Sequence, residues 1–328
     1  MAKPGSHRDP GHGPVRHHGA VLPTRIPHGR TARRVEWAHL PPGVRRAVES
    51  RLGSAVEEAA SQGGGFTPGF ASVLTCADGT RHFVKAASVK AQRMFAESYR
   101  EETRKLRLLP PGVPAPRLLW ADEVEEWVLL GIEYVEGRAP HRPWTAGDLA
   151  LCSAMAVQMA DLLTPAPGAA LSTAVEEFAA WPALWQQIDH PRAAEIGALA
   201  DRYAEVVAGG TLVHTDIRDD NILVLDEDRA VLCDWNWPVV GAAWLDSLFL
   251  LIGPRGDGID VEAHIAAHPL LASVPAEDID VALALVLGYF TVSANEPVPS
   301  TSPWVRAAQA WQRDVIDDWL AERRGWES

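Results

Sequence analysis

Cysteine is scarce in this sequence, and its three cysteines (Cys76, Cys152 and Cys233) are widely separated. An odd, scattered set predicts neither a disulfide scaffold nor a zinc site built from cysteines. Long hydrophobic runs are also lacking, because the longest charge-free apolar stretch, residues 281–295, falls short of the roughly 18–20 residues that span a bilayer. Basic residues are in deficit, with 30 Lys and Arg against 43 Asp and Glu, which disfavours nucleic acid as a partner. We therefore expect a cytoplasmic protein without membrane or nucleic-acid partners.

The chain has ample material for a hydrophobic core, but its charge is unevenly spread. Of its 328 residues 47% are hydrophobic, and the formal net charge is −13. Residues 1–34 contain seven Lys and Arg and one Asp, a net charge of +6, so the rest of the chain carries −19. Because this basic leader is rich in Gly, Pro and His and has no apolar periodicity, we expect it to be disordered.

The segment after the leader has the pattern of a small sheet with one important helix. We expect a helix over residues 44–61, then two strands, 66–76 and 81–86, joined by an Asp-Gly turn. A helix over residues 91–109 follows and stops at two prolines. After Gly137 the sequence changes to Ala- and Leu-rich helical patterns. A β-rich lobe followed by a helix-rich lobe predicts an active-site cleft between them.

A lysine and a glutamate in this first lobe are expected to pair. Lys85 ends an apolar strand pattern, where a lysine alone would usually face solvent. In the helix that follows, Glu102 falls within the apolar stripe, whereas Glu97 and Glu101 point elsewhere. A carboxylate on a buried face is costly unless it is paired, and Lys85 is its natural partner. Such a pair would hold the ammonium group over nucleotide phosphates.

The strongest pattern in the sequence is His214-Thr215-Asp216, with Asn221 five residues after the aspartate and Asp234 after a short hairpin. An antiparallel hairpin returns the chain to its starting point, so Asn221 and Asp234 must lie at the same open end. Their amide oxygen and carboxylate make a hard-oxygen site suited to Mg²⁺. Asp216 is placed to accept a proton from a substrate hydroxyl. A surface loop whose acids cap turns would explain one aspartate but not this set.

These residues together resemble the protein-kinase-like fold, and more closely the aminoglycoside phosphotransferase family of small-molecule kinases. Asp234-Trp235-Asn236, followed by Gly241 and Asp246, is similar to that family's run of Asp, aromatic, acid, Gly and Asp. The resemblance is specific as a set rather than through any one residue.

The resemblance covers about residues 63–251 and implies an α+β, protein-kinase-like bilobal fold. A small β-rich N-lobe is expected over residues 35–135 and a larger, mainly helical C-lobe over residues 136–328. Residues 132–137 are similar to the kinase hinge between the lobes.

The resemblance also implies ATP or GTP and Mg²⁺ as cofactors and gives the main residues their roles. Asp216 would orient and deprotonate the acceptor hydroxyl. Asn221 and Asp234 would hold Mg²⁺. Lys85, oriented by Glu102, would contact the α- and β-phosphates.

Supporting roles follow from the same resemblance. Asp246 would brace the catalytic loop by accepting backbone N–H bonds, with His214 in a similar supporting part. Arg218 would neutralise charge on the transferring phosphoryl group. Backbone groups of Glu133 and Val135 would bind the adenine edge.

The sequence departs from the family pattern in three places. Its glycine turn does not fit G-x-G-x-x-G, because Pro68 occupies the third glycine position. Backbone N–H groups around Phe66 and Thr67 are still expected to cap phosphates. Thr215 replaces the glycine that is common before the catalytic aspartate. In the expected metal segment, Asp234-Trp235-Asn236, Asn236 replaces the usual second acid.

We therefore predict an ATP- and Mg²⁺-dependent phosphotransferase that acts on a hydroxyl of a small molecule. Antibiotics (aminoglycoside, peptide, nucleoside or macrolide) and metabolite alcohols are the candidate acceptors, and the charge of −19 would suit a cationic one. The late helical segments 281–294 and 304–319 should build the acceptor site, with Trp237 as a candidate wall.

Two alternatives remain open at this point. The first is a catalytically inactive kinase fold that serves as a binding module, although Lys85, Asp216, Asn221 and Asp234 are all present. The second is a protein Ser/Thr kinase, for which the eleven residues between Asp234 and Asp246 are too few to form a substrate-docking activation segment.

Overall fold

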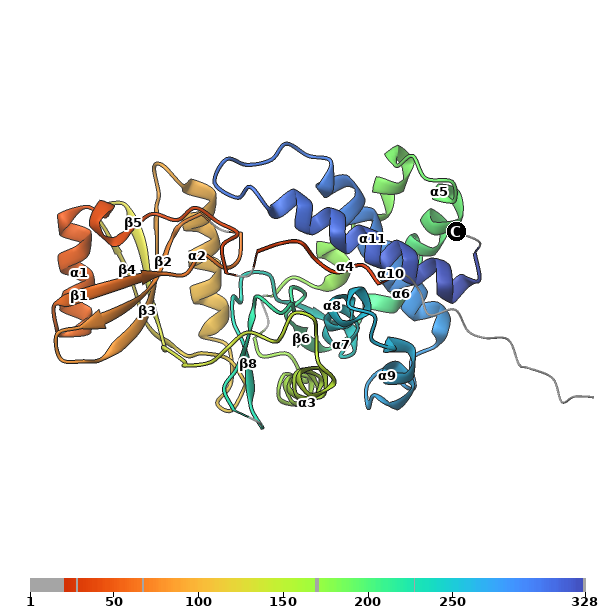
Figure 1. Ribbon diagram of the computed structural model, residues 1–328, viewed down its shortest axis with the longest axis horizontal. Coiled ribbons are helices and arrows are strands. Elements are labelled where there is room, and N and C mark those ends of the chain that lie inside the picture. The colour runs from red at the N-terminus through yellow and green to blue at the C-terminus, as the bar shows by residue number, and fades with distance from the viewer. Residues whose placement is uncertain (1–20, 28, 67, 169–170, 227, 327–328) are drawn as a thin grey trace, which may run out of the picture.

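The protein has two lobes (Figure 1). The computed structural model describes residues 21–27, 29–66, 68–168, 171–226 and 228–326. One lobe is built on a five-stranded antiparallel sheet, and the other is mainly helical with two small two-stranded sheets. The predicted α+β, bilobal architecture is confirmed.

The sheet of the first lobe has the strand order β1-β2-β3-β5-β4. Its strands are β1 (Val56–Ser61), β2 (Phe70–Cys76), β3 (Arg81–Ser88), β4 (Leu118–Val124) and β5 (Trp127–Ile132). Helix α1 (Pro42–Leu52) packs with Val84 and Ala86 of β3 in one hydrophobic cluster. Ala87 packs with residues of helix α2 (Arg93–Leu106) in the other. Because side chains alternate along a strand, Lys85 projects on the α2 side.

The structure corrects the predicted helix over residues 44–61. Helix α1 ends at Leu52, because Gly53 adopts the left-handed conformation (φ 76°) and donates its N–H to the Glu49 carbonyl. The second half of the predicted helix is the edge strand β1, which pairs antiparallel with β2. Its sequence, Val-Glu-Glu-Ala-Ala-Ser, has no decisive periodicity, so pairing with a neighbouring strand decides its structure.

The second lobe follows a hinge after β5. Its helices are α3 (Ala146–Leu162), α4 (Ala174–Glu177), α5 (Ala193–Ala200), α6 (Tyr203–Val207), α7 (Leu245–Leu250), α8 (Ile252–Gly256), α9 (Val261–Ala267), α10 (Ala276–Ala294) and α11 (Val305–Arg324). Its strands are β6 (Thr211–Val213), β7 (Ile222–Val224), β8 (Ala230–Leu232) and β9 (Val239–Gly241), and two 3-10 segments are η1 (Trp37–His39), in the first lobe, and η2 (Pro182–Gln187). Over the described ranges, every helix is too short or too polar to cross a membrane.

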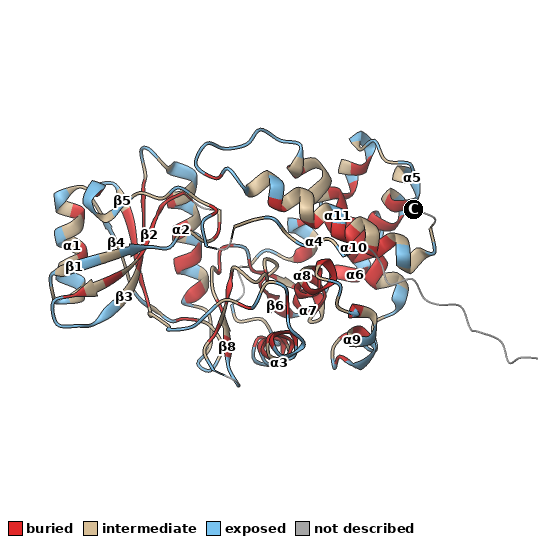
Figure 2. Ribbon diagram, viewed as in Figure 1, coloured by how far each residue is buried: buried red, intermediate tan, exposed pale blue. Residues whose placement is uncertain are grey.

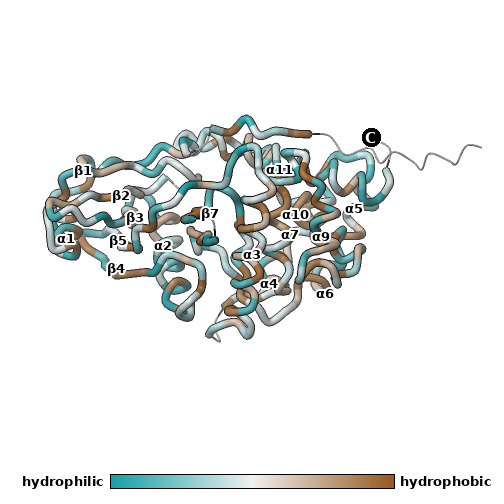
Figure 3. The backbone as a smooth tube through the Cα atoms, turned by 60° about the horizontal axis from the view of Figure 1, so that its bottom comes forward, coloured by the Kyte–Doolittle hydropathy of each residue, from teal (hydrophilic) through white to brown (hydrophobic). Residues whose placement is uncertain are grey.

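Helix α10 forms the centre of the second lobe. Residues 281–288 are buried without interruption (Figure 2), and the hydropathy colouring shows the same apolar centre (Figure 3). A helix that is apolar on all sides is stable only when its neighbours cover it completely. Here α5, α6 and α11 supply that cover, so the end of α10 that reaches the active site rests on a rigid core.

The described part of the N-terminal leader bridges the two lobes. Residues 21–27 and 29–34, here named the strap, run from the helical lobe towards the sheet (Figure 1). Leu22 donates its N–H to the last carbonyl of α8 at 2.8 Å, and Thr31 donates its N–H to the Gly63 carbonyl at 2.8 Å. The expectation of disorder is wrong for this part, because backbone hydrogen bonds, the hydroxyl of Thr31 and the packing of Leu22 against the core hold it. The remaining leader residues lie outside the described part of the chain.

Candidate active site

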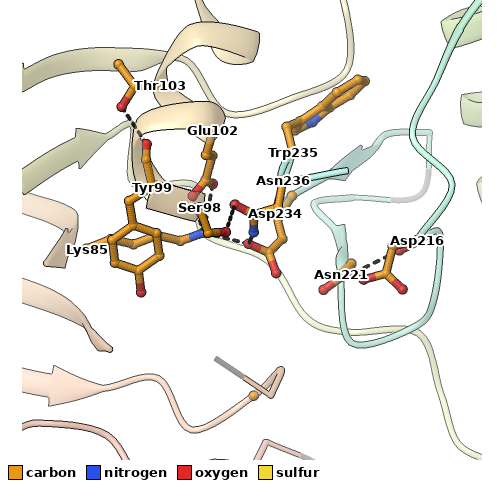
Figure 4. A network of polar contacts seen from close by, with 12 residues as sticks. Lys85, Ser98, Tyr99, Glu102, Thr103, Asp216, Asn221, Asp234, Trp235 and Asn236 are labelled. Atoms are coloured by element: carbon orange, nitrogen blue, oxygen red, sulfur yellow. Dashed lines mark hydrogen bonds and ion pairs between the residues drawn. The ribbon is translucent and has the colours of Figure 1, made fainter. Parts of the chain in front are cut away.

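Lys85 lies at the centre of an ionic cluster between the lobes (Figure 4). Its Nζ lies 2.7 and 2.9 Å from the two carboxylate oxygens of Glu102 and 2.7 Å from Oδ1 of Asp234. Glu102 is 1% exposed, whereas the side chains of Glu97 and Glu101 are 56% and 51% exposed. The predicted pairing and helical phase are therefore present, and Asp234 joins the pair.

The charges of Lys85 and Asp234 keep each other ionised. Burial favours the neutral form of Lys85, but the carboxylates of Asp234 and Glu102 outweigh it and raise the pKa of the ammonium above its usual value. Burial would also raise the pKa of Asp234, yet the Lys85 charge and hydrogen bond hold that pKa below its usual value. The site therefore contains a permanent cation beside an ionised carboxylate.

The β7–β8 hairpin places Asn221 beside the segment that begins at Asp234. Asn221 precedes β7, and its carbonyl accepts the N–H of Cys233 at 2.8 Å, next to Asp234. The Asn221 side chain donates its Nδ2 to the Asp216 carbonyl at 2.8 Å and to Asp216 Oδ2 at 3.1 Å. Its Oδ1 is thus left on the opposite side of the amide from Asp216. This matches the convergence that the sequence predicted.

The loop between β6 and β7 is braced by two buried residues. Asp246 accepts the backbone N–H groups of His214 and Thr215 at 2.7 and 2.8 Å. The ring of His214 contacts the Cys233 carbonyl through Nε2 at 3.0 Å and accepts the Asp216 N–H at Nδ1, 3.3 Å away. Burial lowers the pKa of His214, so its ring is neutral with the proton on Nε2. His214 thereby joins the loop that carries Asp216 to the end of β8, next to Asp234.

Two residues of the site hold left-handed backbone conformations. Thr215 and Asp234 both have φ of 66°. A β-branched residue in this region costs about 1–3 kcal/mol and persists only where its surroundings enforce it. The Thr215 N–H bond to Asp246 and an Oγ1 bond to the Trp237 carbonyl at 3.0 Å supply that enforcement. The threonine thus occupies a position where glycine would carry no strain.

Arg218 lies directly against Asp216. Its Nε is 3.0 Å from Asp216 Oδ1, its Nη2 is 3.3 Å from Oδ2, and its guanidinium carbon lies 5.2 Å from the centre of the Phe66 ring. Burial raises the pKa of Asp216, and the Arg218 charge opposes that rise without cancelling it. A carboxylate whose pKa is raised is a better proton acceptor.

Sequence analysis missed the function of Asn236 as a link between the lobes. Asn236 Nδ2 donates to Asp234 Oδ1 at 2.6 Å, and its Oδ1 accepts the Ser98 hydroxyl at 3.1 Å. Lys105 Nζ donates to the Asn236 carbonyl at 2.7 Å. One face of α2 carries Ser98, Glu102 and Lys105 at helical spacing. The sequence therefore shows a polar helix face, but it does not show that Asn236 is the partner of that face.

A cavity of about 450 Å³ opens beside the ionic cluster. Glu133 and Val135 of the hinge line it together with residues from both lobes, which include Lys85, Glu102, Asn221 and Asp234. The Glu133 N–H is already donated to the Arg117 carbonyl at 2.8 Å. A flat ring at this hinge would therefore meet the Glu133 carbonyl and the Val135 backbone.

A second cavity of about 420 Å³ lies on the other side of Asp234. Asp216, Arg218 and Trp237 line it, and Trp237 is 58% exposed. Its far walls come from α10 and α11 (Val286, Tyr289, Phe290, Val305, Ala308, Gln309 and Gln312). The late helices and Trp237 thus meet at one cavity, as the sequence predicted for the acceptor site.

The comparison with protein families decides the identity of the chain. A family model described as the phosphotransferase enzyme family matches residues 77–277, more than half of the chain. The chain belongs to the phosphotransferase enzyme family. The predicted class of activity, phosphoryl transfer to a small molecule's hydroxyl group, is confirmed at the level of the family.

Solved structures show which fold this phosphotransferase shares. A choline kinase from Streptococcus pneumoniae is 14% identical, with a TM-score of 0.58, over 86% of this chain and 98% of that one. A spectinomycin phosphotransferase bound to AMP is 12% identical, with a TM-score of 0.56, over 85% and 97%. A macrolide 2′-phosphotransferase is 15% identical, with a TM-score of 0.56, over 80% and 94%. These identities show the fold alone, and no curated protein sequence matches significantly.

The donor set of this phosphotransferase fits a Mg²⁺ ion shared with a nucleotide. Among the residues that the structure describes, no group of three or more His, Cys, Asp or Glu side chains could hold a metal ion by itself. Asn221 and Asp234 offer an amide oxygen and a carboxylate, and Mg²⁺ commonly takes only one or two carboxylates and completes its shell with phosphates and water. The site therefore fits the ion only together with its nucleotide.

One predicted residue of this phosphotransferase lies elsewhere than expected. Phe66 lines the acceptor-side cavity and is absent from the described lining of the nucleotide-side cavity. Its carbonyl accepts the Ser302 hydroxyl, which draws the glycine turn towards the helical lobe. Thr67, the other residue expected to cap phosphates, lies outside the described residues.

Proposed function

We propose that this phosphotransferase moves the γ-phosphoryl group of ATP to a hydroxyl group of a small molecule with a broad apolar face. One observation carries the proposal: Asp234 lines both cavities, and Asp216 on the acceptor side is hydrogen-bonded to Asn221 on the nucleotide side. A phosphoryl group at this junction would face a hydroxyl bound over Asp216.

The residues of the junction divide the chemistry between them. Lys85 binds the α- and β-phosphates, and Asp216 accepts the proton of the attacking hydroxyl. Arg218 holds Asp216 in place and counters negative charge on the group in transfer. Asn221 and Asp234 would hold Mg²⁺, which neutralises phosphate charge when it is bound. Positioning and electrostatics are the main requirements of phosphoryl transfer.

The walls of the acceptor cavity favour an apolar ring system over a polycation. Trp181 stacks on Tyr289 with ring centres 4.4 Å apart and an angle of 17°, and the ring centre of Phe178 also lies 4.4 Å from that of Trp181. The carboxylates among the described lining residues are Glu177, Asp216 and Asp234. The last two are paired with Arg218 and Lys85, so Glu177 alone remains to meet a cation.

The experiment is an ADP-release screen with mass spectrometry of the product. Macrolides, nucleosides and aromatic alcohols form one arm, and aminoglycosides and basic peptides form the other. We expect turnover in the first arm, and Trp181→Leu should raise KM for that acceptor while KM for ATP stays unchanged. Turnover confined to the polycationic arm would refute the acceptor class.

Asp216→Asn tests the chemistry itself. It should lower kcat roughly 10²–10⁴-fold with little change in ADP affinity, because only the proton acceptor is lost. Asp226→Asn, on the exposed turn of the same hairpin, is the matched control and should be silent. Turnover of Asp216→Asn within a few-fold of the unaltered protein would show that another group accepts the proton.

A further inference from the structure

We propose that Arg34, carried by the strap, binds the phosphates of the nucleotide together with Lys85. This inference rests on the proposed function, because it assumes that the cavity beside Lys85 holds a nucleotide. Arg34 lies outside the matched family segment, residues 77–277. It lines the same cavity as Lys85 and Asp234, so a second cation stands in the wall of that site.

The strap holds Arg34 at the glycine turn through several hydrogen bonds. Arg34 Nη2 donates to the Gly64 carbonyl at 2.5 Å. Thr31, which is 4% exposed, donates its N–H to Gly63 at 2.8 Å and its hydroxyl to Gly65 at 2.5 Å. Three successive carbonyls of the turn are thus bonded to the strap. The guanidinium position is therefore fixed by the turn that would cover a nucleotide.

The charge of the site gives the second reason. Lys85 faces two carboxyl groups, Glu102 and Asp234, so its positive charge is already balanced before any phosphate arrives. A nucleotide phosphate chain brings further negative charge into the same cavity. Arg34 offsets the excess, and its guanidinium donates to phosphate oxygens in a planar, two-pronged geometry.

The sequence of the glycine turn gives the third reason. Pro68 occupies the third glycine position of this turn, and proline has no backbone N–H to donate. A turn that has lost a donor binds phosphate less well, unless another group supplies one. Arg34 is a cationic donor at this turn. Its Nη2 lies close to Gly65, because a Cβ atom added to that glycine would be 3.6 Å from it.

The test compares nucleotide and nucleoside binding to three variants by calorimetry. Arg34→Ala should weaken binding of ADP and ATP about 10- to 100-fold, the usual effect of a charge-assisted hydrogen bond, and leave adenosine affinity unchanged. Arg34→Lys should recover much of the loss because it keeps the charge. Arg33→Ala is the matched control: Arg33 is exposed, and the bond from its backbone N–H to the Thr301 carbonyl is kept in the variant.

The outcomes separate this inference from the proposed function. Equal ADP affinity of Arg34→Ala and the unaltered protein would overturn the role of Arg34 and leave the proposed function standing. Equal weakening of adenosine and ADP, without recovery in Arg34→Lys, would show that Arg34 only supports the fold. Failure of the unaltered protein to bind any adenine nucleotide would overturn the proposed function itself. Melting curves without nucleotide check that each variant is folded.

Discussion

Replacement of Glu102 by Gln tests the buried ion pair between Lys85 and helix α2, and the exposed Glu101 of the same helix provides the comparison. The change keeps the size of the side chain but removes the charge that Lys85 contacts at 2.7 and 2.9 Å. Lys85 retains Asp234, whose side chain is 28% exposed, so it is not left without a partner. The loss should therefore be about 1.5–3 kcal/mol, that of a charge-assisted hydrogen bond, below the roughly 3–5 kcal/mol of a fully unpaired buried charge.

The same change should impair activity, because Lys85 would move towards Asp234 and disturb both the phosphate and metal positions. If misplacement of Lys85 raises the activation free energy by as much as the lost hydrogen bond lowers the stability, kcat/KM falls about 10- to 150-fold. Glu101→Gln is the matched control, since Glu101 is 51% exposed and pairs with Arg104. It should stay within about 0.5 kcal/mol in stability and within a few-fold in activity.

Urea denaturation without nucleotide and steady-state ADP release measure the two effects. A larger effect of Glu101→Gln than of Glu102→Gln, or silence of both, would refute the assigned helix phase and the pairing.

Two further predictions test the metal segment and the second lobe. Asp234→Ala should abolish the Mg²⁺-dependent part of ADP binding, measured by calorimetry with and without Mg²⁺. If Mg²⁺ still strengthens ADP binding to the variant as much as to the unaltered protein, the prediction is wrong. Burial lowers the pKa of His268 to about 4, below its usual value of about 6.5. The unfolded chain therefore gains this proton first, so stability is full above about pH 6.5 and is lost as the pH falls towards 4. Urea denaturation should show a loss of about 2 kcal/mol between about pH 7.5 and 5 that disappears in His268→Gln, and equal pH slopes would contradict it.

The features that the sequence revealed are those set by covalent connectivity and periodicity. Asn221 and Asp234 converge because a hairpin must bring its ends together, whatever surrounds it. Glu102 faces inward because 100° per residue fixes its position relative to the apolar side chains of its helix. The catalytic loop and the ionic pair could therefore be placed from local pattern alone.

The features that were missed depend on partners distant in sequence. The strap is held partly by backbone groups, such as the N–H of Thr31 on the Gly63 carbonyl, and a backbone hydrogen bond leaves no mark on residue type. Asn236 reads as the loss of an acid, but its amide links α2 to the metal segment. An amide has both a donor and an acceptor, which a carboxylate in its place would lack.

The acceptor class that we propose does not follow the net charge of the chain. The charge of −19 outside the leader favoured a cationic acceptor, yet several carboxylates of the second lobe are paired with arginines that line neither described cavity. Arg255 contacts Asp318 and Glu322, and Arg323 contacts Glu262 and Asp280. Opposite charges in contact contribute little field at a distance, and salt screens what remains beyond about 8–10 Å. The side chains of the cavity itself therefore govern recognition, and these are mainly aromatic and aliphatic.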